Sequence, residues 1–127
     1  MEEHEHHESL IDGIAKQFAQ VFNSSGQGIY VYLDDTHKVC NAKFAELLGY
    51  DSPQEWQKVT TSFPQTFVAD NSQDALISAY QNAMNKCDGS VNNISWKKKD
   101  GSTFDTKVIL VPAEFDNHLF ALHFVLV

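Results

Sequence analysis

The last ten residues of the chain, His118 to Val127, are almost all apolar. A strand with this pattern is typical of a central position, buried on both faces and flanked by other strands. The two segments before it, 91–98 and 103–113, alternate between apolar and polar side chains, and an Asp-Gly hairpin signal separates them. The final third of the chain therefore predicts a three-stranded antiparallel meander.

A second, shorter hairpin is predicted near the start, with strands at 28–33 and 37–40 around an Asp-Asp-Thr turn. Two strands alone are only marginally stable in water, so we expect this hairpin to join the meander. Helical signals lie between the two groups of strands, after Asn41, after Ser52 and over 72–87. The sequence thus predicts an α+β fold, a five-stranded antiparallel sheet with helices on one face.

An amphipathic helix is predicted over residues 9–23, with Ser9 as its N-cap. Its apolar stripe needs cover, either from the outer face of the sheet or from a second copy of the chain. If a second copy provides the cover, the stripe forms a dimer interface, which consists of Leu10, Ile14, Phe18, Val21 and Phe22. The domain boundaries follow: a disordered polar tail over 1–8, a flanking helix over 9–25 and a domain over 26–127.

The first eight residues include three histidines and four glutamates, which bind divalent metals when they are held in place. A disordered tail has no fixed geometry, so its metal binding would be weak and unselective. We therefore predict no metal site. We also predict no catalytic residues, because the sequence contains none of the usual nucleophile, phosphate-loop or zinc-protease motifs. Cys40 and Cys87 are interpreted as reduced thiols.

The charge of the chain excludes several kinds of partner. The net charge is −8, and there is no arginine to pair with phosphate groups. This balance argues against nucleic-acid binding and against binding to anionic membranes. No apolar run approaches the roughly 20 residues of a membrane-spanning helix, and the acidic start is unlike a signal peptide. We therefore expect a cytoplasmic protein.

Several of these segments together resemble the PAS domain family. The resemblance is carried by the segment from Gly28 to Asp34, by Val39-Cys-Asn-Ala-Lys-Phe44, by Leu47-Leu-Gly-Tyr50 and by Trp96-Lys-Lys-Lys-Asp-Gly-Ser102. In their order and spacing they are similar to the strand–turn–strand–helix opening and the later Asp-Gly hairpin of that family. The resemblance covers about residues 26–127, and it implies a PAS-like sheet with the N-terminal amphipathic helix as a flanking element.

The resemblance implies a sensor domain in signal transduction, with a ligand pocket between helices and sheet, a homodimer and an effector such as a histidine kinase. The cofactor is unknown. Haem-binding members of the family use a histidine on the long helix, and the segment 72–87 contains none, so haem is not supported. Flavin photosensors of the family use a cysteine on a helix, whereas Cys40 lies at a strand end, so flavin photochemistry is not supported either. Without arginine, a small apolar or aromatic ligand is favoured, with Tyr80 and Trp96 as polar groups. The predicted pocket residues are Phe44, Leu48, Trp56, Phe63, Phe67, Leu76, Tyr80, Trp96, Phe120 and Leu122. His118 and His123 should face opposite sides of the last strand, so that one of them can approach the pocket.

Two other functions stay open at this point. The first is a ligand-free interaction or dimerisation module, in which the same aromatic side chains form an ordinary filled core. The second is a small enzyme of the nuclear-transport-factor-like class, which also places helices over a curved sheet. The early hairpin at 28–40 argues against the second, because that class places its helices before most of its strands.

Overall fold

A single antiparallel sheet organises the computed structural model, which describes the backbone of residues 2–127 and the side chains of residues 6–127. Its strands are β1 (Gly28–Tyr32), β2 (Lys38–Cys40), β3 (Ser90–Lys97), β4 (Thr103–Phe115) and β5 (His118–Leu126). The strand order is β2-β1-β5-β4-β3. The early hairpin therefore pairs with the last strand, and the predicted five-stranded sheet with β5 at its centre is confirmed.

The helices between the two groups of strands cover one face of the sheet. They are α3 (Ala42–Leu47), α4 (Pro53–Gln57), α5 (Phe63–Phe67), the 3-10 turn η1 (Asp70–Ser72) and α6 (Gln73–Lys86). Asn41 and Ser52 cap α3 and α4 through their side-chain oxygens, as their positions in the sequence predict. Helix α6 ends at Cys87, which takes the left-handed C-cap conformation with a φ of 54° and has an exposed side chain.

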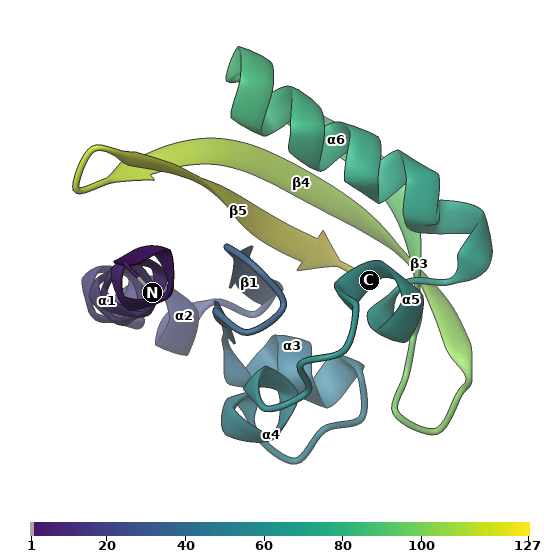
Figure 1. Cartoon of the computed structure of the whole chain (residues 1–127). Coiled ribbons are helices and arrows are strands. Elements are labelled where there is room, and N and C mark those ends of the chain that lie inside the picture. The colour runs from purple at the N-terminus through teal and green to yellow at the C-terminus, as the bar shows by residue number, and fades with distance from the viewer. Residues whose placement is uncertain (1) are drawn as a thin grey trace.

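The N-terminal segment lies on the opposite face of the sheet. Figure 1 shows α1 (Glu2–Gln17) and α6 on opposite sides of β4 and β5. The helix begins at Glu2, so the prediction of a disordered tail was wrong over 2–8, and Ser9 lies inside the helix instead of capping it. Met1 lies outside the described residues. A break at Phe18 separates α1 from α2 (Ala19–Ser24). His7 contacts Asp34 in the turn between β1 and β2, and this contact holds the first turns of α1 in place. Local sequence signals cannot predict a contact between residues so far apart in the chain.

Two apolar layers result from this arrangement. The layer under α3 to α6 is aromatic and includes Tyr30, Phe44, Trp56, Phe67 and Trp96, all at most 1% exposed. The second layer lies between α1 and the outer face of the sheet. It includes Ile14, Phe22, Val31, Phe120 and Leu122. In the described part of the chain, no helix has the length and apolar character needed to cross a membrane.

Candidate functional site

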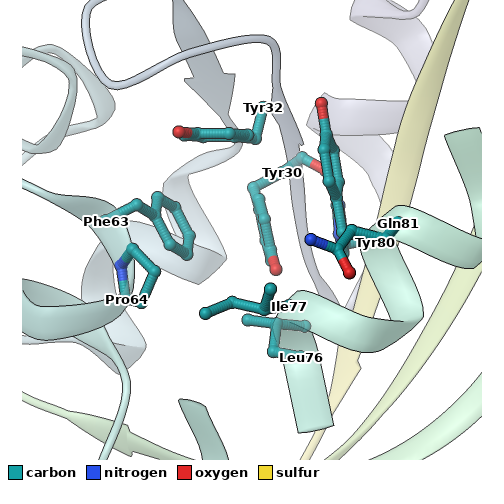
Figure 2. A pocket seen from close by; sticks show the side chains of 9 residues that line it. Tyr30, Tyr32, Phe63, Pro64, Leu76, Ile77, Tyr80 and Gln81 are labelled. Atoms are coloured by element: carbon teal, nitrogen blue, oxygen red, sulfur yellow. The ribbon is translucent and has the colours of Figure 1, made fainter. Parts of the chain in front are cut away.

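A pocket of about 240 Å³ lies between the sheet and the helices α5 and α6. Strands β1 and β5 form its floor, and residues of α5 and α6 form its walls (Figure 2). The lining consists of Tyr30, Tyr32, Phe63, Pro64, Leu76, Ile77, Tyr80, Gln81 and His123, and we call it the Tyr30 pocket. None of these side chains is a carboxylate, a lysine or an arginine, so the pocket is suited to an uncharged molecule.

Tyr30 and His123 form the floor of the Tyr30 pocket. They are directly opposite each other on β1 and β5, and their rings stack with centroids 4.0 Å apart and planes 9° apart. Nδ1 of His123 lies 3.3 Å from the Tyr30 carbonyl oxygen, to which it donates when the neutral ring carries its proton on Nδ1. Burial lowers the pKa of His123 to about 3, and two backbone carbonyl groups oppose this only in part. His123 is therefore neutral at physiological pH, with Nε2 as a hydrogen-bond acceptor.

The Tyr30 hydroxyl is a buried polar group without a hydrogen-bond partner among the described residues. Figure 2 shows it directed toward Leu76 and Ile77 of α6, two apolar side chains. The phenol ring is 1% exposed, and burial raises its pKa well above the usual value, so it stays a neutral donor. A hydroxyl buried in this way costs about 1–3 kcal/mol unless something accepts its proton. Tyr30, a residue of the pocket lining, thus carries a buried hydroxyl that no described residue pairs.

Asp35 positions two further residues of the pocket. Its Oδ1 accepts hydrogen bonds from the Tyr32 hydroxyl and from the backbone N–H of Phe63, both at 3.0 Å. Burial, followed by the contact with Asp35, raises the pKa of Tyr32 far above its usual range. The turn between β1 and β2 is thereby tied to the start of α5. The position of the pocket wall therefore depends on a carboxylate that lies outside the pocket.

Three of the ten predicted pocket residues, Phe63, Leu76 and Tyr80, line the Tyr30 pocket. Five others belong to the filled aromatic core beside it; they are Phe44, Leu48, Trp56, Phe67 and Trp96. Trp96 is not a polar group of the pocket, because its Nε1 donates to Thr106 Oγ1 at 2.8 Å inside the core. Nε1 of Trp56 is a second buried donor without a partner in the described region, but Trp56 does not line the pocket.

Phe120 and Leu122, the other two predicted pocket residues, lie on the wrong face of the sheet. They pack against the N-terminal helices in the outer layer. Successive side chains of a strand point to opposite faces, so on β5 it is His123 that reaches the helical face. Because β5 is apolar on both faces, its sequence does not indicate which side chains face the helices. The prediction that one of the two histidines approaches the pocket is confirmed, and that residue is His123.

The predicted dimer stripe lies largely inside the single chain. Leu10, Ile14 and Phe22 are between 0% and 8% exposed, and Ile14 and Phe22 belong to the outer layer. Phe18 packs edge-on against Phe120, with ring centroids 5.9 Å apart. Val21, at 44% exposed, is the member that faces solvent. The outer face of the sheet therefore provides the cover that the sequence left open between the sheet and a second copy.

The residues of the pocket do not fit haem or flavin. Helix α6 carries no histidine, and His123 is stacked on Tyr30 and bonded to its carbonyl group. Cys40 is buried outside the pocket lining, and burial raises the pKa of its thiol far above the usual range. The volume of about 240 Å³ is also below the roughly 300–1,000 Å³ of pockets for drug-sized ligands.

Sequence reasoning missed Tyr30, Tyr32, Pro64, Ile77 and Gln81. The segment from Gly28 to Leu33 is apolar or aromatic throughout, so its sequence does not indicate which alternate side chains face the helices. A two-residue period does place Tyr30 and Tyr32 on one face, and their phenol groups were the available signal. Ile77 and Gln81 are exposed residues of α6 that line the pocket, and their helix carries no signal that distinguishes them as pocket residues.

An antiparallel sheet with a central C-terminal strand, helices over one face and a pocket beneath them defines a module of the PAS type. The comparisons agree: a family model described as PAS domain matches residues 16–81, and the chain belongs to the PAS domain family. A search of curated proteins finds no relative at a significant level.

Solved structures show the same fold. The PAS domain of an HTR-like protein from Haloarcula marismortui is 18% identical over 95% of this chain and 97% of its own, with a TM-score of 0.60. A PAS domain from a two-component sensor histidine kinase is 15% identical over 90% and 96%, with a TM-score of 0.64. The PAS domain of a protein from Colwellia psychrerythraea is 21% identical over 88% and 94%, with a TM-score of 0.67.

Proposed function

We propose that this protein is a sensor domain of signal transduction that binds a small, neutral organic molecule in the Tyr30 pocket. The single observation that carries the proposal is the Tyr30 hydroxyl, a donor in the pocket floor with no acceptor among the described residues. Buried polar groups in proteins are nearly always paired. A ligand with a hydrogen-bond acceptor would supply the missing partner.

The lining restricts the chemistry of the ligand. The pocket holds the volume of roughly eight water molecules, so a ligand with on the order of ten non-hydrogen atoms fits. Aromatic rings of Tyr30, Tyr32, Phe63 and Tyr80 surround it, and they favour an apolar or aromatic body. A carboxylate would find no cation in the lining. The proposed ligand is therefore an uncharged molecule with one carbonyl, ether or hydroxyl oxygen.

A function in signalling also requires an output, and we propose an effector such as a histidine kinase. One similar structure is the PAS domain of a two-component sensor histidine kinase, which supports this class of effector for a domain of this fold. No constellation for catalysis is needed in such a role. We therefore propose a sensor module and not an enzyme, with α6 and the strands β1 and β5 as the elements that contact the ligand.

Dimerisation through the N-terminal helix remains a proposal. Because Leu10, Ile14 and Phe22 are covered by the chain's own sheet, a second copy would contact the exposed side of α1 and α2, where Val21 lies. Sedimentation-equilibrium measurements on wild type and Val21→Lys test this. The charged variant should lower the dimer fraction. A monomeric wild type at about 0.1 mM, or a dimer unaffected by Val21→Lys, would reject this interface.

The ligand proposal is tested by a thermal-shift screen with neutral aromatic and aliphatic alcohols, ketones and ethers. A ligand selective for the folded state raises the unfolding midpoint with its concentration. Tyr30→Phe should weaken the affinity for each hit roughly tenfold, the equivalent of about 1.4 kcal/mol for one hydrogen bond. Tyr50→Phe is the matched control, because Tyr50 loses the same atom outside the pocket lining.

A second variant tests the volume of the pocket. Ile77→Trp should fill the mouth of the pocket and abolish the midpoint shift while the protein stays folded. Binding that is equally strong in wild type, Tyr30→Phe and Ile77→Trp would place the ligand elsewhere. A screen without any hit at millimolar concentrations would favour the interaction module with a filled core.

A further inference from the structure

Three side chains with metal-binding atoms meet where the N-terminal helix crosses the turn between β1 and β2. They are His7 of α1, and Asp34 and His37 of the turn. One potential ligand atom from each lies within 4.8 Å of the other two. His37 is buried, and the other two are partly buried. Residues from two distant parts of the chain therefore meet at one point.

Short contacts to the Asp34 carboxylate hold this cluster together. Its Oδ2 lies 2.6 Å from Nδ1 of His7 and 3.0 Å from Nδ1 of His37. Its Oδ1 accepts from the backbone N–H groups of Thr36 and His37 at 2.9 and 2.7 Å, which fix the orientation of the carboxylate. The turn thus holds the carboxylate between the two imidazole rings, with Oδ2 next to His7 and Oδ1 closest to His37, 2.8 Å from its Nδ1.

Two further imidazole rings, those of His118 and His6, lie beside the cluster. The ring centroid of His118, at the start of β5, is 5.7 Å from that of His7 and 5.3 Å from that of His6. Imidazole groups from α1, from the turn and from β5 therefore gather in one part of the molecule, and those of His7 and His37 contact the Asp34 carboxylate.

We propose that His7, Asp34 and His37 form a binding site for a divalent transition-metal ion of the Zn²⁺ class. Imidazole nitrogen with one carboxylate oxygen suits Zn²⁺, whereas Ca²⁺ and Mg²⁺ prefer oxygen alone. Zinc ligands lie about 2.0–2.2 Å from the metal, so tetrahedral ligand atoms are roughly 3.3 Å apart. Nδ1 of His7 and Nδ1 of His37 lie 2.6 and 3.0 Å from Asp34 Oδ2, and the three ligand atoms are all within 4.8 Å of one another, so these separations bracket the tetrahedral distance. Side-chain adjustments on the order of 1 Å would complete the site. Each Nδ1 would bind the metal without its proton, and the Nε2 atom of the same neutral ring would then carry the proton.

The site would act on the fold in a specific way. It would join the start of α1 to the turn between β1 and β2, two segments that local chain connectivity leaves independent. Asp35, the next residue in that turn, positions Tyr32 and Phe63 in the Tyr30 pocket. The metal site goes beyond the proposed ligand binding and stands without it, because it shares no residue with the pocket lining.

The competing explanation is chelation of the metal by the histidines of the first eight residues alone. A pair of matched variants distinguishes this explanation from the proposed site. Zn²⁺ binding is measured by calorimetry on metal-free wild type, His37→Gln and His6→Gln. For the proposed site, His37→Gln lowers the affinity by on the order of tenfold or more, and His6→Gln leaves it nearly unchanged. His7→Gln and Asp34→Asn should behave like His37→Gln. The asparagine keeps an oxygen that can accept the turn hydrogen bonds.

The unfolding midpoint provides an independent measurement that does not depend on the variants folding. A site built from α1 and the turn exists only in the folded state, so Zn²⁺ at about a hundred times its dissociation constant should raise the wild-type midpoint by on the order of 10 °C. Chelation by a short segment persists after unfolding and gives almost no shift. The proposal is overturned by an unchanged midpoint, by a loss of affinity in His6→Gln but not in His37→Gln, or by no binding at all.

Discussion

Replacing Tyr30 with phenylalanine should make the ligand-free protein more stable. The substitution removes one oxygen atom and leaves the ring in place, so the stacking on Phe44 and His123, with centroids at 4.7 and 4.0 Å, is kept. The oxygen it removes is buried and finds no acceptor in the described part of the chain. The folded state therefore loses an unfavourable buried group and no hydrogen bond.

The size of the effect follows from the desolvation of that hydroxyl. Leaving a buried donor unpaired costs about 1–3 kcal/mol, and residual contacts of the oxygen offset part of this. We expect Tyr30→Phe to raise the free energy of unfolding by about 1–2 kcal/mol. For a domain of this size, each kcal/mol shifts the unfolding midpoint by about 3–6 °C. Urea denaturation monitored by circular dichroism measures the free energy directly, with an unchanged m value.

Tyr50→Phe again provides the control, because its partly exposed ring lies at the edge of the same aromatic core. It should change stability by less than about 0.5 kcal/mol. A loss of 1 kcal/mol or more in Tyr30→Phe would refute the reasoning, since it would mean that the hydroxyl is paired in the folded protein. Together with weaker ligand binding in the same variant, a gain in stability would identify Tyr30 as a binding residue that the fold alone does not require.

Three further variants test other parts of the structure. Ile14→Ala should lower the free energy of unfolding by about 2–5 kcal/mol, because Ile14 is fully buried against the sheet; a loss near zero in urea denaturation would mean that α1 is not part of the domain. Asn41→Ala should lower the free energy of unfolding by roughly 2–4 kcal/mol, because the Asn41 side chain accepts from the backbone N–H groups of Ile29 and Phe44 and donates to the carbonyl groups of Phe22 and Gln27. Asn41→Asp keeps the acceptor but turns a buried carboxylate oxygen toward those two carbonyl oxygens, so it should also destabilise the fold, and wild-type stability of either variant in urea would contradict this network. The pKa of His123 is about 3 in the folded state and 6.5 for the free group, so between these values the unfolded state binds one proton more than the folded state. The contribution of neutral His123 to the free energy of unfolding is therefore fully present above pH 6.5 and falls by about 1.4 kcal/mol per pH unit between pH 6.5 and 3. Stability measured against pH should show a smaller slope in His123→Phe, and an identical slope would contradict a buried neutral His123.

The strands and caps could be predicted from the sequence because their signals are local. The alternation over 91–98 and 103–113, the Asp-Gly turn and the oxygen of Asn41 act over a few residues, and each appears in the structure as expected. Even the joining of the early hairpin to β5 followed from a simple argument, since an isolated pair of strands is too weak to stand alone. The resemblance to the PAS family rested on the same local segments.

The pocket was predicted only in part, because its position depends on which face each strand presents. Leu76 and Tyr80 were predicted from the helix expected over 72–87, and Phe63 as an aromatic anchor of the irregular segment before it. Phe120 and Leu122, in contrast, were placed on the wrong side of β5. A strand that is apolar on both faces carries no period from which its orientation can be read. The register of β5 against β1, which pairs His123 with Tyr30, decides the matter.

By itself, then, the sequence determined the main strands and helices, their order along the chain and the absence of an arginine for anionic partners. Only the tertiary structure decided that α1 covers the outer face, that the hydroxyl of Tyr30 is left without a partner, and that His7 meets Asp34 and His37. The physical reason is distance along the chain: periodicity and capping act within a few residues. Contacts between residues 27 or 93 positions apart are set by the twist, register and packing of the whole sheet.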